Sequence, residues 1–252
     1  VLADEASKRL FITDSNHNRI VISTTDGKLL DIIGSGQLGR KDGSFAEASF
    51  DHPQGVALHE DTLYIADTEN HMLRKANLKT RRVTTISGTG EQSRNPWPNY
   101  RPLKPQNKRR NFLGKPKGMA LNSPWALWVH GKNLFIAMAG PHQIWRMTLN
   151  ERVIGPYAGN GREDIVDGKL LPGEPYEAGY SSFAQPSGLA SDGKWLYVAD
   201  SEGSSIRAVP FDPKQQVKTV VGTAHLFSGR LFHFGDRDGP KNRALLQHAL
   251  GV

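Results

Sequence analysis

The sequence predicts an all-β fold, a β-propeller with about four four-stranded blades, and three observations support this prediction. A β-rich run that ends in a turn recurs along the chain, with an apolar residue at a fixed distance after the turn begins. A phrase that starts at or near an aromatic residue precedes most copies of this run, and a second β-rich run into glycine closes each one. Four short antiparallel strands per unit, repeated around an axis, are typical of a propeller.

The recurring motif lies at residues 10–22, 63–78, 134–146 and 196–208. Within it an apolar residue follows the reference position by six residues in every copy. The reference residues are Asp14, Asp67, Met138 and Asp200, and the apolar residues are Ile20, Leu73, Ile144 and Ile206. Aromatic-to-Gly phrases precede three copies at 50–58, 122–129 and 183–191, and a fourth phrase stands at 246–252. These phrases predict blades at 1–49, 50–120, 121–182 and 183–245, with 246–252 opening another.

The stretch L-Y-I-A-D-T-E-N-H-M-L-R-K-A-N-L (63–78) shows how one unit is expected to fold. Its two apolar runs predict the second and third strands of a blade, because β-branched and aromatic residues bounded by turn formers favour strands. Asp and Asn side chains bond nearby backbone amides and tolerate left-handed geometry. We therefore interpret the recurring polar residues as turn-forming rather than catalytic, and expect Asp67 to pair with Arg74 across the hairpin. The turn residues are Asp14, Asp67, Asn70, His71 and Asp200.

The phrases P-Q-G-V-A (53–57) and I-A-D-T-E-N-H-M-L (65–73) resemble the signature of the NHL repeat family. Other phrases, such as G-R-K-D-G-S-F-A-E-A-S-F and V-A-D-S-E-G-S-S-I-R, are similar to the NHL domain of the thioredoxin-like and NHL-repeat proteins. This resemblance implies a ring that usually has six blades, with a thioredoxin-like domain before it. It also implies that this chain, with about four blades, is a segment of a longer protein.

The net charge of +7 is concentrated in one Pro-rich insertion at residues 91–118. It holds eight basic residues against Glu91 alone, which leaves 24 basic and 24 acidic residues elsewhere. Trp97, Tyr100 and Phe112 are interspersed among them. Such a mixture can bind phosphates and stack on bases, so a solvated loop, a protein-docking loop and a nucleic-acid contact all remain open. The candidate contact residues are Arg94, Arg101, Lys104, Lys108, Arg109 and Arg110.

Asp-Gly pairs begin at Asp42, Asp167 and Asp238, before three of the expected blade entries. They predict tight turns in the connections between blades. Loops on a rigid scaffold are also where binding residues concentrate, so these connections are candidates for a binding rim. The candidate rim residues are Arg40, Lys41, Asp42, Arg162, Asp167, Arg237 and Asp238, with Lys241 beside them.

The sequence gives little support for catalysis. There is no Cys, which excludes disulfides, Cys-based zinc sites and thiol nucleophiles within these residues. No G-x-S-x-G, H-E-x-x-H or P-loop motif is present. His17, His71 and His142 lie in equivalent turns, but successive blades hold such turns too far apart for one ion with ligands at about 2 Å. We therefore expect no catalytic residue, no metal and no cofactor.

The sequence also shows no membrane-spanning stretch and no targeting segment, and it leaves the compartment undetermined. We expect a non-catalytic interaction scaffold that presents the loops between blades to a protein partner or to an adjacent thioredoxin-like domain. The alternatives are a propeller that binds nucleic acid through the basic insertion and, with less support, a metal-dependent lyase or hydrolase at the central channel.

Overall fold

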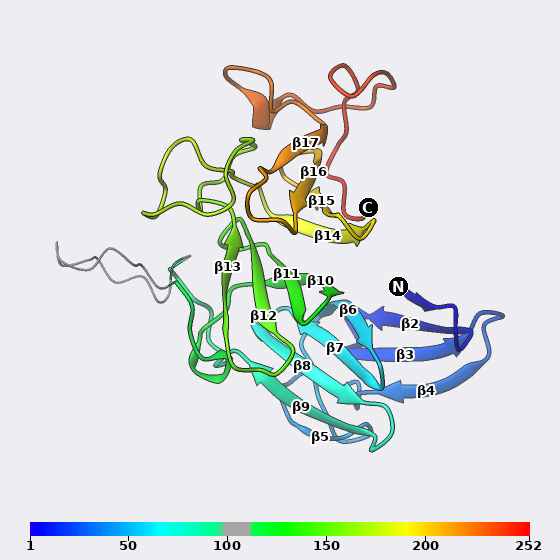
Figure 1. The fold of residues 1–252 in the computed structure, drawn as a ribbon. Helices are drawn as coiled ribbons and strands as arrows, with labels where there is room; N and C mark the ends of the chain where they lie inside the picture. The colour runs from blue at the N-terminus through cyan, green and yellow to red at the C-terminus, as the bar shows by residue number, and fades with distance from the viewer. Residues whose placement is uncertain (96, 98–111) are drawn as a thin grey trace, which may run out of the picture.

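Four antiparallel sheets follow one another along the chain in the computed structural model, which describes residues 1–95, 97 and 112–252. The four main strands of each sheet lie in sequence order, as in the blades of a propeller, and one sheet has an additional two-residue strand at its edge. The sheets are arranged as an arc, and the two ends of the chain lie on the same side of it (Figure 1). The sequence-based prediction of four four-stranded blades is confirmed.

The strands of the four blades have the following bounds. Blade 1 contains β1 (Leu2–Asp4), β2 (Arg9–Asp14), β3 (Arg19–Thr24) and β4 (Leu29–Ile33). Blade 2 contains β6 (Pro53–His59), β7 (Thr62–Asp67), β8 (Met72–Asn77) and β9 (Arg82–Ser87), with the short β5 (Gly43–Ser44) paired to β9. Blade 3 contains β10 (Pro124–His130), β11 (Asn133–Met138), β12 (Gln143–Thr148) and β13 (Ile154–Ala158). Blade 4 contains β14 (Pro186–Ser191), β15 (Trp195–Asp200), β16 (Ser205–Pro210) and β17 (Lys218–Val221). The 3-10 turns are η1 (Ser15–His17), η2 (Pro116–Gly118) and η3 (Arg230–Phe232).

The central strands of blades 2 and 3, which have a neighbouring blade on each side, are buried on both faces, which explains their nearly continuous apolar sequences. In β7, Leu63 and Ile65 lie in the apolar cluster shared with blade 1. Tyr64 and Ala66 face the other way and lie in the cluster shared with blade 3. A third cluster joins blades 3 and 4. Because successive residues of a strand point to opposite faces, each blade contributes one set of side chains to each neighbour.

The first strands of all four blades line one central cavity of about 490 Å³. Gly55 of β6 explains why glycine is needed in the Pro-x-Gly phrase of blade 2. A side chain there would clash with the carbonyl oxygen of Trp125, and its Cβ would lie 2.8 Å from the Cα of Ala126. The inner strands of blades 2 and 3 therefore approach as closely as their backbones allow.

The face of blade 1 that points away from blade 2 is only half-buried. Leu10, Ile12 and Val21 share this face and are partly exposed, and Leu30 is exposed.

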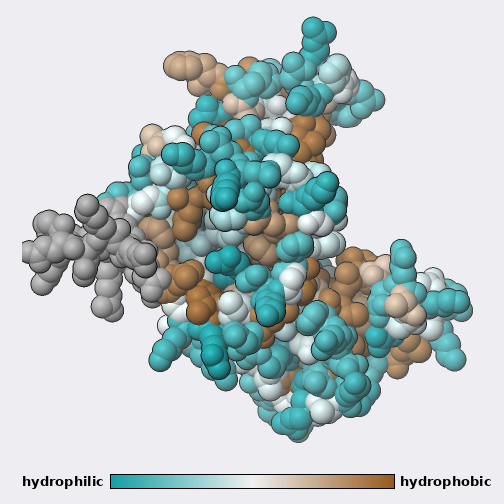
Figure 2. Space-filling model, in the orientation of Figure 1, coloured by the Kyte–Doolittle hydropathy of each residue, from teal (hydrophilic) through white to brown (hydrophobic). Residues whose placement is uncertain are grey.

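Figure 2 shows hydrophilic residues over most of the visible surface, with smaller apolar areas among them. Within the described residues, no helix has the length and apolar character that crossing a membrane requires.

Candidate functional site

The candidate rim residues lie on one side of the propeller, which we call the connection face. This face carries the connections between blades together with the β2–β3, β7–β8, β11–β12 and β15–β16 turns. Arg40, Lys41 and Arg162 are exposed there. Asp42 and Asp167 are also about half exposed, but each pairs with a buried arginine of the following blade. These two aspartates therefore also hold the connections in place.

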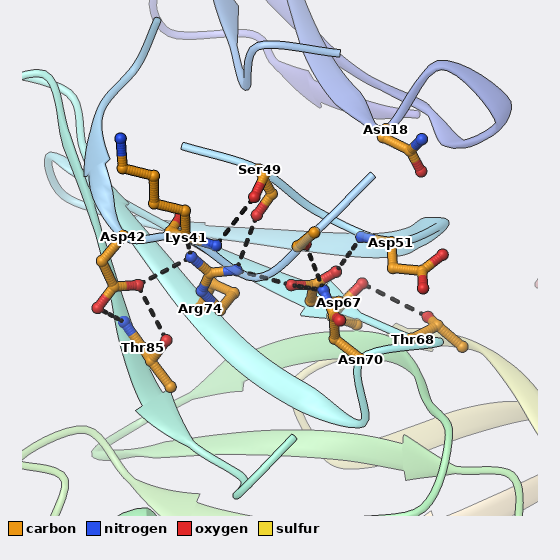
Figure 3. Close-up of polar contacts among 12 residues, drawn as sticks. Asn18, Lys41, Asp42, Ser49, Asp51, Asp67, Thr68, Asn70, Arg74 and Thr85 are labelled. Atoms are coloured by element: carbon orange, nitrogen blue, oxygen red, sulfur yellow. Dashed lines mark hydrogen bonds and ion pairs between the residues drawn. The ribbon is translucent and has the colours of Figure 1, made fainter. Parts of the chain in front are cut away.

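Asp67 is the centre of a buried hydrogen-bond network in blade 2 (Figure 3). Its Oδ1 accepts the backbone N–H of Asp51 at 2.8 Å, and its Oδ2 accepts a hydrogen bond from Asn70 at 2.9 Å. Arg74 Nη1 donates to the same Oδ2 at 2.8 Å. The expected pairing of Asp67 with Arg74 is confirmed. The aspartate does more than shape its own turn, because it also fixes the entry to β6.

Arg74 carries the network into the connection that leads from blade 1 to blade 2. Its Nη1 donates to the carbonyl of Ser49 at 3.0 Å, and its Nη2 donates to the carbonyl of Lys41 and to Asp42, both at 2.8 Å. Asp42 in turn accepts hydrogen bonds from the backbone and hydroxyl of Thr85 on β9. We call this arrangement, a buried Asp and Arg of one blade with an Asp of the preceding connection, the Asp–Arg latch.

Blade 4 repeats the latch with different residues. Arg207 donates to Asp200 at 3.2 Å and to Asp167 at 3.1 Å, and to the carbonyls of Ser182 and Val166, both at 2.8 Å. Thr219 takes the place of Thr85 and donates to Asp167 at 2.7 Å. An aromatic ring also lies beside each guanidinium, with Phe50 at 5.2 Å from Arg74 and Phe183 at 5.1 Å from Arg207. The same arrangement of side chains thus fixes two connections.

Burial dominates the electrostatics of the latches. It raises the pKa of Asp67 to about 6, although the Asp51 amide, Arg74 and Asn70 favour the ionised form. Burial likewise raises the pKa of Asp200 to about 6, against the charge of Arg207. Both values lie above the usual 3.8, so the contribution of each group to the free energy of unfolding falls as the pH rises from about 4 to about 6. The pKa of Asp42 is lowered, because hydrogen bonds from Thr85 and the charge of Arg74 outweigh its burial.

Blades 1 and 3 do not repeat the latch. In blade 3, Met138 and Trp145 occupy the positions of the aspartate and the arginine, and both are buried. The Trp145 indole donates to Gln143, which donates to the carbonyl of Gly159. In blade 1, Asp14 is partly exposed and pairs with Arg19, and Val21 stands at the arginine position.

Every blade also makes a second kind of contact with the start of the next blade, a hydrogen bond that the sequence analysis missed. A turn residue with positive φ accepts, through its side chain, the backbone N–H of a second positive-φ residue at the start of the next blade. The four pairs are Asn18 with His52, His71 with Ser123, His142 with Gln185, and Ser204 with His248. The donor–acceptor distances are 3.0 to 3.2 Å. We call these pairs the turn links.

The turn links account for two of the three histidines that were weighed as metal ligands. His71 and His142 use Nδ1 as the acceptor, so each imidazole is neutral, and burial lowers the pKa of both. His17 is one residue out of register: Asn18 is the equivalent of His71, and His17 instead pairs with Asp14. Within the described residues, no cluster of three or more His, Cys, Asp or Glu residues could hold a metal ion.

Two aromatic residues of the basic insertion are packed against each other. Trp97 and Phe112 are 1% and 7% exposed, and their ring centroids are 4.7 Å apart. Trp97 also lies against Gly161 of the next connection, where a Cβ would come within 2.9 Å of the indole nitrogen. Arg94 is described and exposed. The other candidate residues of the insertion, Arg101, Lys104, Lys108, Arg109 and Arg110, lie outside the described residues, as does Tyr100.

The remaining rim residues belong to the connections themselves. Arg40 donates to the carbonyl of Gly90, Arg162 to that of Tyr176 at 2.9 Å, and Arg237 to that of Arg243 at 2.8 Å. Asp238 is exposed. These contacts hold the arginine side chains against neighbouring loops of the connection face.

Comparison with known proteins identifies relatives of the chain. No family model matches the chain. The sheets and turns define a β-propeller, and its Pro-x-Gly phrases are similar to those of NHL repeats. The chain is similar to NHL repeat-containing protein 2 of Bos taurus, with 39% identity over 100% of the chain, and to the Arabidopsis thaliana protein SUPPRESSOR OF QUENCHING 1, chloroplastic, with 40% identity over 99%. The resemblance predicted from the sequence is confirmed.

The chain spans only part of these relatives, 35% of the cattle protein and 22% of the plant protein. Among solved structures, a protein of unknown function from Bacteroides thetaiotaomicron has a TM-score of 0.62 at 18% identity, covering 99% of this chain and 52% of that one. An auxiliary nutrient binding protein from the same organism has a TM-score of 0.60, also at 18% identity. At this identity the likeness concerns the fold alone.

Proposed function

We propose that this propeller is a non-catalytic interaction platform whose connection face receives a protein partner. The first candidate partner is a thioredoxin-like domain of the same polypeptide, since the chain spans about a third or less of its relatives. The two Asp–Arg latches carry this proposal. They attach the connections to buried side chains, so the loops are presented in one shape and little entropy is lost on binding.

Charge indicates the character of the partner surface. Arg40, Lys41 and Arg162 are exposed on the connection face, and the basic insertion belongs to the sequence that connects β9 to β10. Opposite potentials across an interface speed association and exclude wrong partners. An acidic surface is therefore the expected complement.

The central cavity supports a non-catalytic role. Its described lining consists of backbone and of apolar, Gln and Ser side chains from the inner strands and the two chain ends. Within that lining no His, Asp, Glu, Lys or Arg side chain is available as a general acid or base, or as a metal ligand. A lyase or hydrolase centred on this cavity would lack those groups.

Cross-linking the full-length protein tests the proposal. Lysine-directed cross-links should join the partner domain to Lys41 and Lys241 on the connection face, and not to Lys28, Lys132 or Lys194 on the opposite turns. A variant with Arg40, Lys41 and Arg162 changed to Glu should lose at least about tenfold in affinity for the partner, more at low salt than at high salt. The matched control changes Lys28, Lys132 and Lys194 to Glu and should bind normally. Equal binding by both variants would refute the role of this face.

Nucleic-acid binding is the second candidate, supported by the charge of the insertion. Two of its three aromatic rings, Trp97 and Phe112, are buried and therefore unavailable for base stacking. If the insertion binds RNA through its phosphates alone, affinity should fall steeply with salt, and changing Lys108, Arg109 and Arg110 to Ala should abolish it. No binding at low salt would exclude this function.

A further inference from the structure

A cavity of about 570 Å³ lies between blades 3 and 4, on their outer strands. Its floor is formed by β12 and β13 and its wall by the β16–β17 hairpin, and residues of the connection between blades 3 and 4 complete the lining. Its size falls within the range of about 300 to 1,000 Å³ that is usual for small-molecule sites. The lining residues used below are Arg146, Tyr157, Lys169, Tyr180, Phe211 and Lys214.

Positive charge in this cavity is not neutralised. Arg146, Lys169 and Lys214 all line it, and the lining contains no Asp or Glu. Among the described residues, no ion pair involves any of the three. Asp212 lies in the same hairpin but is exposed and outside the lining, and its carboxylate accepts the backbone N–H of Lys214 at 3.0 Å.

Aromatic rings give the cavity a fixed shape. The Arg146 guanidinium lies 5.2 Å from the ring centroid of Tyr157, and the Lys169 ammonium lies 5.8 Å from that of Tyr180. The Tyr157 hydroxyl donates to the carbonyl of Pro210 at 2.8 Å, which ties blade 3 to the hairpin of blade 4. Cations held against rings are more ordered than free surface lysines.

The equivalent position in blade 2 shows that this charge is a specific feature of one interface. Lys75 pairs across β7–β8 with Tyr64, as Arg146 pairs across β11–β12 with Phe135. Lys75 forms an ion pair with Glu151 from the β12–β13 hairpin of the next blade. The β16–β17 hairpin supplies Lys214 instead of an acid to Arg146. The interface between blades 2 and 3 thus neutralises its cation, whereas the interface between blades 3 and 4 brings three cations together.

We propose that this cavity binds a small organic anion that carries a flat ring. Its carboxylate or phosphate would lie among Arg146, Lys169 and Lys214, and its ring against Tyr180 and Phe211. Arg and Lys donate charge-assisted hydrogen bonds to both kinds of anion, so the shared chemistry is a compact anionic group beside an aromatic body. This inference does not depend on the proposed partner of the connection face.

Titration of the intact chain with four probes tests the proposal. Adenosine monophosphate and 3-phenylpropionate each combine a ring with an anion, adenosine has the ring without the charge, and inorganic phosphate has the charge without the ring. At least one ring-bearing anion should bind more than about tenfold more tightly than adenosine and phosphate, in calorimetry or in NMR shifts confined to this cavity. Which of the two binds identifies the anionic group. Absence of binding by both at millimolar concentration would overturn the proposal.

Three variants assign the binding to this cavity. Arg146→Gln should weaken the bound anion at least about tenfold, and Lys214→Glu should do so at least as strongly, since it places an acid beside Arg146 as Glu151 does beside Lys75. Lys214 is exposed, so this variant should fold normally even if Arg146→Gln does not. Lys75→Gln is the matched control and should leave affinity unchanged. Equal losses in Lys75→Gln and Lys214→Glu would contradict the assignment.

Discussion

Blade 3 has the same four-stranded architecture as blades 2 and 4. Its centre is apolar, whereas the centres of blades 2 and 4 contain a buried ion pair. Blades 2 and 4 bury an aspartate and an arginine that reach into the preceding connection. Blade 3 buries Met138 and Trp145 at the same two positions. Its preceding connection also lacks an Asp-Gly pair and contains Trp97 and η2 instead. Three residues therefore change together, as expected if they work as one unit.

Forming the sheet of a blade and fixing the shape of its preceding connection depend on different residues. Blade 3 shows that apolar residues suffice to form the sheet, and buried ion pairs often add no net stability over apolar replacements. The raised pKa of Asp67 and Asp200 reflects the same cost of burying charge. The charged pairs add hydrogen bonds of defined geometry, because each guanidinium holds backbone carbonyls of the connection at fixed places. We infer that the Asp–Arg latches specify loop shape more than stability.

The largest effect is expected from removing one member of a latch. Asp67→Ala leaves the buried Arg74 with the half-exposed Asp42 as its only acidic partner, so the free energy of unfolding should fall by about 3 to 5 kcal/mol. Asp14→Ala, at the equivalent but partly exposed site of blade 1, should cost no more than about 1 kcal/mol. Denaturant unfolding of both variants measures the difference. Similar losses would show that burial of the pair does not matter.

A smaller effect is expected where blade 2 has glycine and blade 3 has alanine. Gly55→Ala should destabilise the protein by about 1 to 3 kcal/mol, because the added Cβ meets the backbone of Trp125 and Ala126. Gly118→Ala is the control, since a Cβ there meets nothing within 4 Å. Thermal unfolding compares the two, and an unchanged melting temperature for Gly55→Ala would contradict the close approach of β6 and β10.

The smallest effect concerns the turn links, which blades 2 and 3 share despite their different centres. Because burial lowers the pKa of His71, its contribution to stability is present above the unfolded pKa of about 6.5 and is lost as the pH falls toward and below the folded pKa. His71→Asn should keep the acceptor, as Asn18 does, without titrating.

The measurement is the free energy of unfolding at pH 7.5 and pH 5 for both proteins. The wild-type protein should lose more stability than His71→Asn between the two values. The titration of Asp67 and Asp200 has the opposite sign but is common to both proteins, so it cancels in the difference. A larger acid loss in His71→Asn would contradict the link.

Sequence reasoning succeeded where the information is local. Short apolar runs bounded by turn formers predicted the strands of each blade, and the positions of Asp67 and Arg74 within one predicted hairpin allowed a cross-hairpin pair to be expected. It could not show that Asp42 contacts Arg74 or that Asp167 contacts Arg207, because these contacts depend on how the connection folds back onto the blade. Sequence alone also placed His17 with His71, whereas backbone conformation aligns Asn18 with His71. The signal for the turn links was a polar residue four positions after each reference residue.

The measurement that tests the latch most directly is a double-mutant cycle of Asp67→Met and Arg74→Met in denaturant unfolding. If the two residues form one buried unit, the double variant should be more stable than the sum of the single losses predicts, with a coupling energy of about 2 to 3 kcal/mol. The double variant should retain the sheet, as blade 3 does with Met138 and Trp145, while exchange protection of the Asp51 amide decreases. Additive losses within about 0.5 kcal/mol would contradict the account.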